Sequence, residues 1–319
     1  MKHLLAIEDL SPEALLELLR VSQSFVGVAA AGTKAPALAG KTVVSLFYED
    51  STRTRLSFES AARRLSADVM NFSVSSSSVK KGESIKDTVQ TIDAMGVDAF
   101  VVRHASVGTA HRLRDYTDAS ILNAGDGAHE HPTQALIDCL TLQQHLGRTD
   151  FTGVRIAIVG DINHSRVARS NVLAFTKLGA EVTLVAPPTL LPPVVDGWPV
   201  HVSHSLDDVL PKVDVVYLLR VQSERIGEAL YPSVSEYVNR YGLTSERARR
   251  LDQHVVVMHP GPMNRGVEVA ADVADGSRSL ILRQVANGIP VRMAALFTAL
   301  LPGSSFDTDG VSFEGVRNV

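Results

Sequence analysis

The amino-acid sequence predicts an α/β protein with two doubly wound parallel-sheet domains joined by two interdomain helices. Strand-like runs rich in β-branched residues alternate with helical patterns along the chain, which is typical of a parallel sheet wrapped by helices. The chain has 319 residues, enough for two domains with full cores. Hydrophobic residues make up 45% and charged residues 21%, the balance of an ordinary globular protein.

The first half of the chain contains one set of alternating elements. Ser11, Pro12 and Glu13 provide an N-cap, a proline at the first helical position and an acid in the first turn, so they predict a helix start. The helix over residues 51–65 has apolar side chains at the spacing of one buried face. Strands are predicted at residues 42–48, 68–74, 99–103 and 120–123, and further helices at residues 84–95 and 107–118.

The second half of the chain contains another set of alternating strands and helices. A helix that opens at His131 and runs to about residue 146 is expected to carry the chain out of the first domain. A helical pattern over residues 285–301 is apolar enough to dock back onto it. Strands are predicted at residues 154–160, 181–186, 213–219 and 254–258, with a helix over residues 167–178. We therefore place the first domain at residues 1–134 plus 288–319 and the second at residues 135–287.

Charge and targeting signals narrow the class of protein. The formal net charge is −4, so no global positive field favours nucleic acid or an anionic membrane as a partner. Glu8 and Asp9 interrupt the N-terminus before an apolar core of signal-peptide length, and no apolar stretch approaches the ~20 residues of a membrane span. The single cysteine, Cys139, predicts a small buried hydrophobe in a reducing compartment. We expect a cytoplasmic protein.

The stretch from Ser51 to Arg55 carries the clearest chemical signal. It follows a predicted strand and opens a predicted helix, where unpaired N–H groups and the positive end of the helix dipole meet. Cations are disfavoured at that end unless an anion is present, yet Arg53 and Arg55 lie there beside Thr52 and Thr54. We interpret the stretch as a phosphate site, in preference to an ordinary capped helix with solvated arginines.

Missing motifs argue against several other sites. Gly160 follows a predicted strand, but the three-glycine spacing of a dinucleotide site is absent, so a nicotinamide-dependent dehydrogenase is a distant alternative. The sequence also lacks a P-loop, a zinc-binding histidine pair and the nucleophile elbow of a serine hydrolase. We expect no metal and no organic cofactor.

Two motifs together resemble a known family. Ser51 to Arg55 after a strand is similar to the carbamoyl phosphate site of the aspartate and ornithine carbamoyltransferases. His131-Pro132-Thr133-Gln134 resembles the family motif His-Pro-x-Gln, although His131 alone would be taken for a helix-capping histidine. Matches continue in order to residues 259–266, so the resemblance covers essentially the whole chain and implies the carbamoyltransferase fold.

The second-domain matches indicate the acceptor. Arg220 and Gln222 resemble the aspartate-binding Arg-x-Gln of the family, and Arg166 matches its other carboxylate-binding arginine. Two arginines suit a dicarboxylic amino acid, and the loops that receive ornithine are absent. The resemblance implies transfer of the carbamoyl group of carbamoyl phosphate to L-aspartate, giving N-carbamoyl-L-aspartate and phosphate in pyrimidine biosynthesis.

The resemblance also implies roles within the first substrate site. The catalytic residues would be Arg53, Thr54, Arg103 and His131. Thr54, Arg103 and His131 would stabilise the oxyanion that forms on the carbonyl oxygen. The full set expected to bind carbamoyl phosphate is Ser51, Thr52, Arg53, Thr54, Ser77, Arg103, His131, Gln134, Gly261 and Pro262. Gln134 and the carbonyls of Gly261 and Pro262 would orient the carbamoyl NH2. Many aspartate enzymes have Leu at the position of Gly261, and glycine there is expected to loosen the loop.

A loop near residues 77–83 would extend the site to another subunit. Its composition favours a solvated turn, but it resembles the mobile loop by which aspartate enzymes send a serine and a lysine into a neighbouring active site. On that pattern Ser77 binds carbamoyl phosphate and Lys81 binds L-aspartate. The resemblance therefore implies a homotrimer with shared active sites.

Three functional alternatives stay open beside this interpretation. They are a carbamoyltransferase for another amino-acid acceptor, an inactive subunit of a pyrimidine complex, and the dehydrogenase. The form Pro-Gly-Pro-x-Asn-Arg-Gly at residues 260–266 resembles aspartate enzymes that associate with dihydroorotase. Dihydroorotase and regulatory chains are therefore the macromolecular partners to consider.

Overall fold

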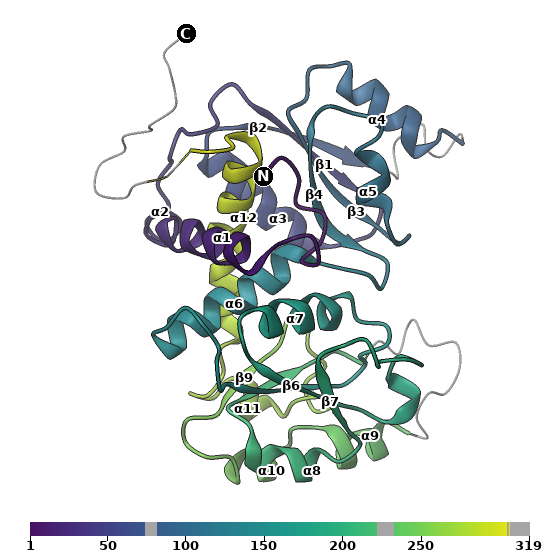
Figure 1. Cartoon of the computed structure of the whole chain (residues 1–319), viewed down its shortest axis with the longest axis vertical. Helices are drawn as coiled ribbons and strands as arrows, with labels where there is room; N and C mark the ends of the chain where they lie inside the picture. The colour runs from purple at the N-terminus through teal and green to yellow at the C-terminus, as the bar shows by residue number, and fades with distance from the viewer. Residues whose placement is uncertain (74–81, 222–232, 305, 307–319) are drawn as a thin grey trace. The chain divides into compact units, whose positions relative to one another are not determined.

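The computed structural model describes residues 1–73, 82–221, 233–304 and 306 (Figure 1). The chain forms two compact units, the first made of Met1–Leu140 with Ala286–Val319 and the second of Thr141–Val285. Two helices cross this division, α6 (Pro132–Leu146) and α12 (Ile281–Leu300). The borders predicted from the sequence fall within the same two helices.

The first unit has a parallel sheet of four strands in the order β2-β1-β3-β4. The strands are β1 (Thr42–Phe47), β2 (Asp68–Ser73), β3 (Ala99–His104) and β4 (Ser120–Asp126). The helices that precede or connect them are α1 (Pro12–Ser24), α2 (Val26–Ala31), α3 (Thr52–Arg64), α4 (Ile85–Asp93) and α5 (Thr109–Leu113). The α/β alternation predicted for the first half of the chain is confirmed.

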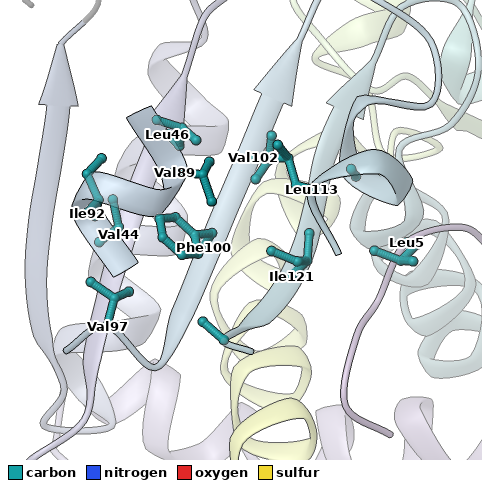
Figure 2. Close-up of a cluster of buried hydrophobic side chains, with 12 residues drawn as sticks. Leu5, Val44, Leu46, Val89, Ile92, Val97, Phe100, Val102, Leu113 and Ile121 are labelled. Carbon is teal, nitrogen blue, oxygen red and sulfur yellow. The ribbon is translucent and has the colours of Figure 1, made fainter. Parts of the chain in front are cut away.

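One face of this sheet carries a buried apolar cluster. Figure 2 shows Val89 and Ile92 of α4 directed toward Phe100 and Val44 of the strands. All four side chains are at most 9% exposed. Burial of apolar area at about 25 cal/mol per Å² is the main stabilising term of such a layer. It fixes the strands whose carboxyl ends carry the polar residues discussed below.

The second unit has a parallel sheet of five strands in the order β7-β6-β5-β8-β9. The strands are β5 (Arg155–Val159), β6 (Glu181–Val185), β7 (Val200–Ser203), β8 (Val215–Leu218) and β9 (Val256–Met258). Its α-helices, apart from the parts of α6 and α12, are α7 (Arg166–Lys177), α8 (Leu206–Val209), α9 (Val234–Tyr241), α10 (Ser245–Arg249) and α11 (Ala271–Ala274). Short 3-10 turns occur at Pro188–Leu190 and Leu210–Lys212.

The strand order reverses once in each sheet, and this determines where ligands can bind. In the first sheet the chain goes from β1 outward to β2 and then back to β3, so β1 and β3 are neighbours. In the second sheet β5 and β8 are neighbours in the same way. Ligands of doubly wound sheets bind beyond the carboxyl ends of the strands at such a reversal. The two reversals are therefore the positions to examine for a site.

Three elements differ from the predictions. The strand β7 was not predicted, because it has only four residues at the edge of the sheet and none of them is buried. The helix predicted over residues 107–118 is much shorter, since α5 covers only Thr109–Leu113. The final helix begins at Ile281 rather than near residue 285 and continues through Pro290.

The N-terminal helical stretch is long and apolar. By length and composition alone Pro12–Ala31 could cross a membrane, since an 18-residue window within it has a mean hydropathy of 1.4, although Glu17 and Arg20 interrupt its apolar run. Such a stretch is weak evidence, since core helices and signal sequences meet the same criterion. Here α1 is an ordinary amphipathic helix, because Leu15, Leu18 and Leu19 are buried while Glu17 and Arg20 pair on the exposed side at 2.6 Å.

Candidate active site

The turn after β1 places the Ser51–Arg55 stretch at the reversal of the first sheet. Ser51 occupies the N-cap position of α3 as predicted, with φ −161° and ψ 93°, but its hydroxyl makes no capping hydrogen bond. Thr52 and Arg53 are exposed and Thr54 is 7% exposed. The first-turn N–H groups of a helix have no acceptor within the helix, and the helix dipole favours an anion there. This turn suits a phosphate group.

Arg55, two residues after Arg53, packs against an aromatic ring. Its guanidinium carbon lies 5.6 Å from the centroid of the Phe47 ring, so it packs on the last residue of β1. A cation over an aromatic face gains about 0.5–1 kcal/mol at a partly exposed site. Of the two arginines in this turn, Arg53 is therefore the one that we assign to the anion.

Arg103 brings a second cation to the same reversal. It lies on β3 in register with Phe47, and its Nη1 donates to the carbonyl of Ala124 at 3.1 Å. Its Nε lies 3.6 Å from Oε2 of Glu49, and both side chains are largely buried. Glu49 belongs to the turn before α3, so this ion pair connects β3 to the Ser51–Arg55 stretch. Sequence analysis did not identify Glu49.

His104 has a local role instead. Its Nδ1 accepts a hydrogen bond from the N–H of Ser106 at 2.8 Å. Burial lowers the pKa of His104, which favours the neutral imidazole that this bond requires.

His131 is 5% exposed and directly precedes α6. The residue before it, Glu130, is buried and accepts hydrogen bonds from the N–H groups of Ile7 and Glu8 at 2.9 and 3.1 Å. Asp126 accepts from the N–H of Glu130 at 3.2 Å. These bonds fix the loop that presents His131. Sequence analysis missed Glu130 and Asp126, although a carboxylate next to His131 was a visible signal.

Gln134 lies in the first turn of α6 and is held by a buried acid. Its Nε2 donates to Oδ1 of Asp138 at 2.9 Å, and Asp138 is fully buried. Since the amide nitrogen is used in this way, the carbonyl oxygen of Gln134 is the atom that can accept from an NH2 group. The role of Gln134 in orienting the carbamoyl NH2 stays a prediction.

The second reversal carries two arginines. Arg166 opens α7 after the N-cap Ser165, whose hydroxyl accepts from the N–H of Ala168 at 3.1 Å. Arg220 follows β8, the neighbour of β5. Gly160 at the end of β5 has φ +126°, and a Cβ there would lie 2.8 Å from the carbonyl oxygen of Leu219. Glycine thus allows the ends of β5 and β8 to approach closely beside the two arginines.

A buried pair fixes the loop after β9. His259 Nδ1 accepts from the N–H of Gly261 at 2.8 Å, and His259 Nε2 lies 3.3 Å from Oε1 of Glu268. Both side chains are at most 1% exposed, and the same Glu268 oxygen accepts from the N–H of Asn264. Gly261 has φ +63°, a left-handed conformation that favours glycine. The loop that carries the Gly261 and Pro262 carbonyls is therefore well anchored.

Comparison with known proteins identifies the family. Residues 2–144 match the family model described as aspartate/ornithine carbamoyltransferase, carbamoyl-P binding domain. Residues 152–299 match the model described as aspartate/ornithine carbamoyltransferase, Asp/Orn binding domain. The aspartate carbamoyltransferase catalytic subunit of Thermobifida fusca is 58% identical over 301 residues, covering 94% of this chain and 96% of that protein. The chain belongs to the aspartate/ornithine carbamoyltransferase family.

Further members of the family are similar to this chain over nearly its full length. The aspartate carbamoyltransferase catalytic subunit of Parafrankia sp. is 56% identical, covering 97% of this chain and 99% of that protein. A crystal structure of Trypanosoma cruzi aspartate transcarbamoylase in complex with N-(phosphonacetyl)-L-aspartic acid superposes with a TM-score of 0.85 at 34% identity. It covers 94% of this chain and 96% of that one. The carbamoyltransferase fold predicted from the sequence is confirmed.

Some predicted carbamoyltransferase residues cannot be placed. Ser77, Lys81 and Gln222 lie outside the described residues. Within the described part of the chain no group of three or more His, Cys, Asp or Glu side chains could hold a metal ion. The free Cys139 is buried, and burial raises the pKa of its thiol well above the usual range.

Proposed function

We infer that the chain transfers the carbamoyl group of carbamoyl phosphate to the amine of L-aspartate, giving N-carbamoyl-L-aspartate and phosphate in pyrimidine biosynthesis. The observation that carries this is the same arrangement at both sheet reversals. Each has a helix N-terminus with an arginine in its first turn, Arg53 or Arg166, and a second arginine after the neighbouring strand or at its end, Arg103 or Arg220. Two such positions suit two anionic substrates.

The relatives support this choice of substrates. Trypanosoma cruzi aspartate transcarbamoylase has been crystallised in complex with carbamoyl phosphate and aspartate. We propose that the first unit binds carbamoyl phosphate through Ser51, Thr52, Arg53, Thr54 and Arg103. The second unit binds L-aspartate, and Arg166, Arg220 and Gln222 bind its two carboxylates.

The chemistry requires stabilisation of an oxyanion. The aspartate amine attacks the carbamoyl carbon, and negative charge develops on the carbonyl oxygen before the bond to phosphate breaks. Thr54, Arg103 and His131 are the proposed donors to that oxygen, and preorganised donors are the largest single term in many such reactions. Gln134 and the carbonyls of Gly261 and Pro262 accept from the carbamoyl NH2.

The proton of the attacking amine needs an acceptor. None of the proposed binding residues is a carboxylate placed to act as general base, so we propose that the departing phosphate takes this proton. Much of the rate then comes from holding two anionic substrates together in the correct orientation, which is worth about 7–11 kcal/mol in favourable intramolecular reactions.

We further propose a cytoplasmic homotrimer with shared active sites, to which Ser77 and Lys81 of a neighbouring subunit contribute. The family resemblance supports the trimer. A single buried cysteine fits a reducing compartment.

The function is tested by phosphate release from carbamoyl phosphate by the purified chain. We expect release that depends on L-aspartate, exceeds an enzyme-free blank and needs neither added metal nor nicotinamide cofactor. Release no faster than the blank at saturating L-aspartate would identify an inactive subunit and contradict the proposal.

A further inference from the structure

Arg292 is a buried cation that the proposed mechanism does not use. It lies in the part of α12 that belongs to the first unit, where its neighbours in the helix are apolar, and it is 4% exposed. A charged side chain in such a position is costly unless it is neutralised or hydrogen-bonded. The free-energy cost of burying this charge therefore has to be offset by a structural or functional role.

The contacts of Arg292 leave its charge without a nearby counter-ion. Its Nη1 donates to the carbonyl of Gly288 at 3.1 Å, and its guanidinium carbon lies 5.0 Å from the centroid of the Phe58 ring. Its Nε is buried without a hydrogen-bond partner. No ion-pairing carboxylate of the described residues lies within 4.0 Å of the guanidinium. Among the described residues, its polar and ring contacts are the Gly288 carbonyl and the face of Phe58.

The surroundings of Arg292 are parts of the proposed carbamoyl phosphate site. Phe58 lies on α3, one turn after Thr54, and α12 runs beside α3 in the first unit (Figure 1). The pKa of Arg292 is lowered to about 9, mainly by burial and then by the positive charge of Arg103, while the negative charge of Asp138 opposes the shift. Asp138 is the acid that holds Gln134. Arg292 thus contacts α3 through Phe58 and interacts electrostatically with Arg103 and Asp138.

We propose that Arg292 is a positioning residue of the carbamoyl phosphate site, which supplies a buried positive charge behind α3 and acts through Arg103 and Asp138. It adds to the potential that attracts the phosphate dianion, and its charge acts on Asp138, the acceptor of Gln134. The bound phosphate supplies the negative charge that Arg292 lacks in the protein itself. This inference rests on the function proposed above.

The test replaces Arg292 by methionine, which has a similar volume and no charge. The matched control is Arg283→Met, because Arg283 is an exposed arginine of the same helix. Calorimetric titration with inorganic phosphate gives the Kd, and steady-state assays give KM for each substrate. We expect Arg292→Met to raise the Kd for phosphate and the KM for carbamoyl phosphate roughly tenfold, within the usual range of coupling between sites. The KM for L-aspartate should change much less, and Arg283→Met should resemble the wild type.

The melting temperature separates this role from a structural one. Removal of an un-neutralised buried charge should leave the ligand-free Arg292→Met protein at least as stable as the wild type. Arg292→Lys keeps the charge and should have an affinity between those of the wild type and the methionine variant. An unchanged Kd for phosphate, or an unfolded or strongly destabilised Arg292→Met protein, would overturn the inference. If the wild type itself fails to bind phosphate, the proposed function is at fault instead.

Discussion

Arg53→Ala is expected to abolish most carbamoyl transfer without unfolding the chain. Arg53 is exposed in the first turn of α3, so its side chain contributes little to stability. In the proposed site it lies where the charge of the leaving phosphate develops, and loss of one preorganised contact commonly costs ~3 kcal/mol in the transition state. This corresponds to a decrease of roughly a hundredfold in kcat/KM for carbamoyl phosphate.

The matched control is Arg63→Ala in the last turn of the same helix. Arg63 is also exposed, but it lies at the end of the helix where a cation suits the dipole. Its removal should cost a few tenths of a kcal/mol in stability and leave the kinetics unchanged. Near-normal kcat/KM in Arg53→Ala, with the fold intact by circular dichroism, would show that the phosphate is bound elsewhere.

Activity should reappear when two inactive variants, Lys81→Ala and His131→Ala, are dissociated and reassembled together. A flexible lysine is useful only where a neighbouring structure fixes its charge, and the proposed trimer places Lys81 in the adjacent site. In a mixed trimer, one interface joins a subunit with intact His131 to a neighbour with intact Lys81. That interface contains one complete site, although each parent alone has none.

The control for reassembly is each variant dissociated and reassembled with itself, which should stay inactive. Exchange of subunits is verified with a charge-tagged copy of one variant, separated by ion exchange. If subunits exchange and the mixture remains inactive, Lys81 serves its own chain and the sites are not shared.

Buried strands were the part of the fold that sequence patterns could predict. The strands β1, β5 and β8 are apolar runs with a charged residue two positions after their ends, so both the element and the residues at its carboxyl end were recognisable. Edge strand β7 was missed because Val200–Ser203 is only four residues long and none of them is buried. The helix α5 was predicted too long, because the chain forms a turn at residues 114–116 directly after Leu113.

Candidate site residues could be found from the sequence where they form a contiguous motif. The role of a residue was harder to predict where it depends on contacts with residues distant in the sequence. The Ser51–Arg55 stretch was found from its position after β1, but only the structure shows that Arg55 packs on Phe47. Asp138 lies in a helix with no motif of its own, and its role depends on Gln134 one turn earlier. Arg292 could have been singled out from the sequence, because it is the only charged residue in the second half of an apolar helix.

The central claim is that the acceptor is L-aspartate. It is tested most directly by incubating the purified protein with carbamoyl phosphate labelled with carbon-13 in the carbamoyl group and an equimolar mixture of L-aspartate and L-ornithine. Carbon NMR then follows the carbamoyl signal. The geometry of Arg166 and Arg220 at the reversal of the second sheet predicts that the label appears in N-carbamoyl-L-aspartate alone. Label in the carbamoylated ornithine at a comparable rate would contradict the account.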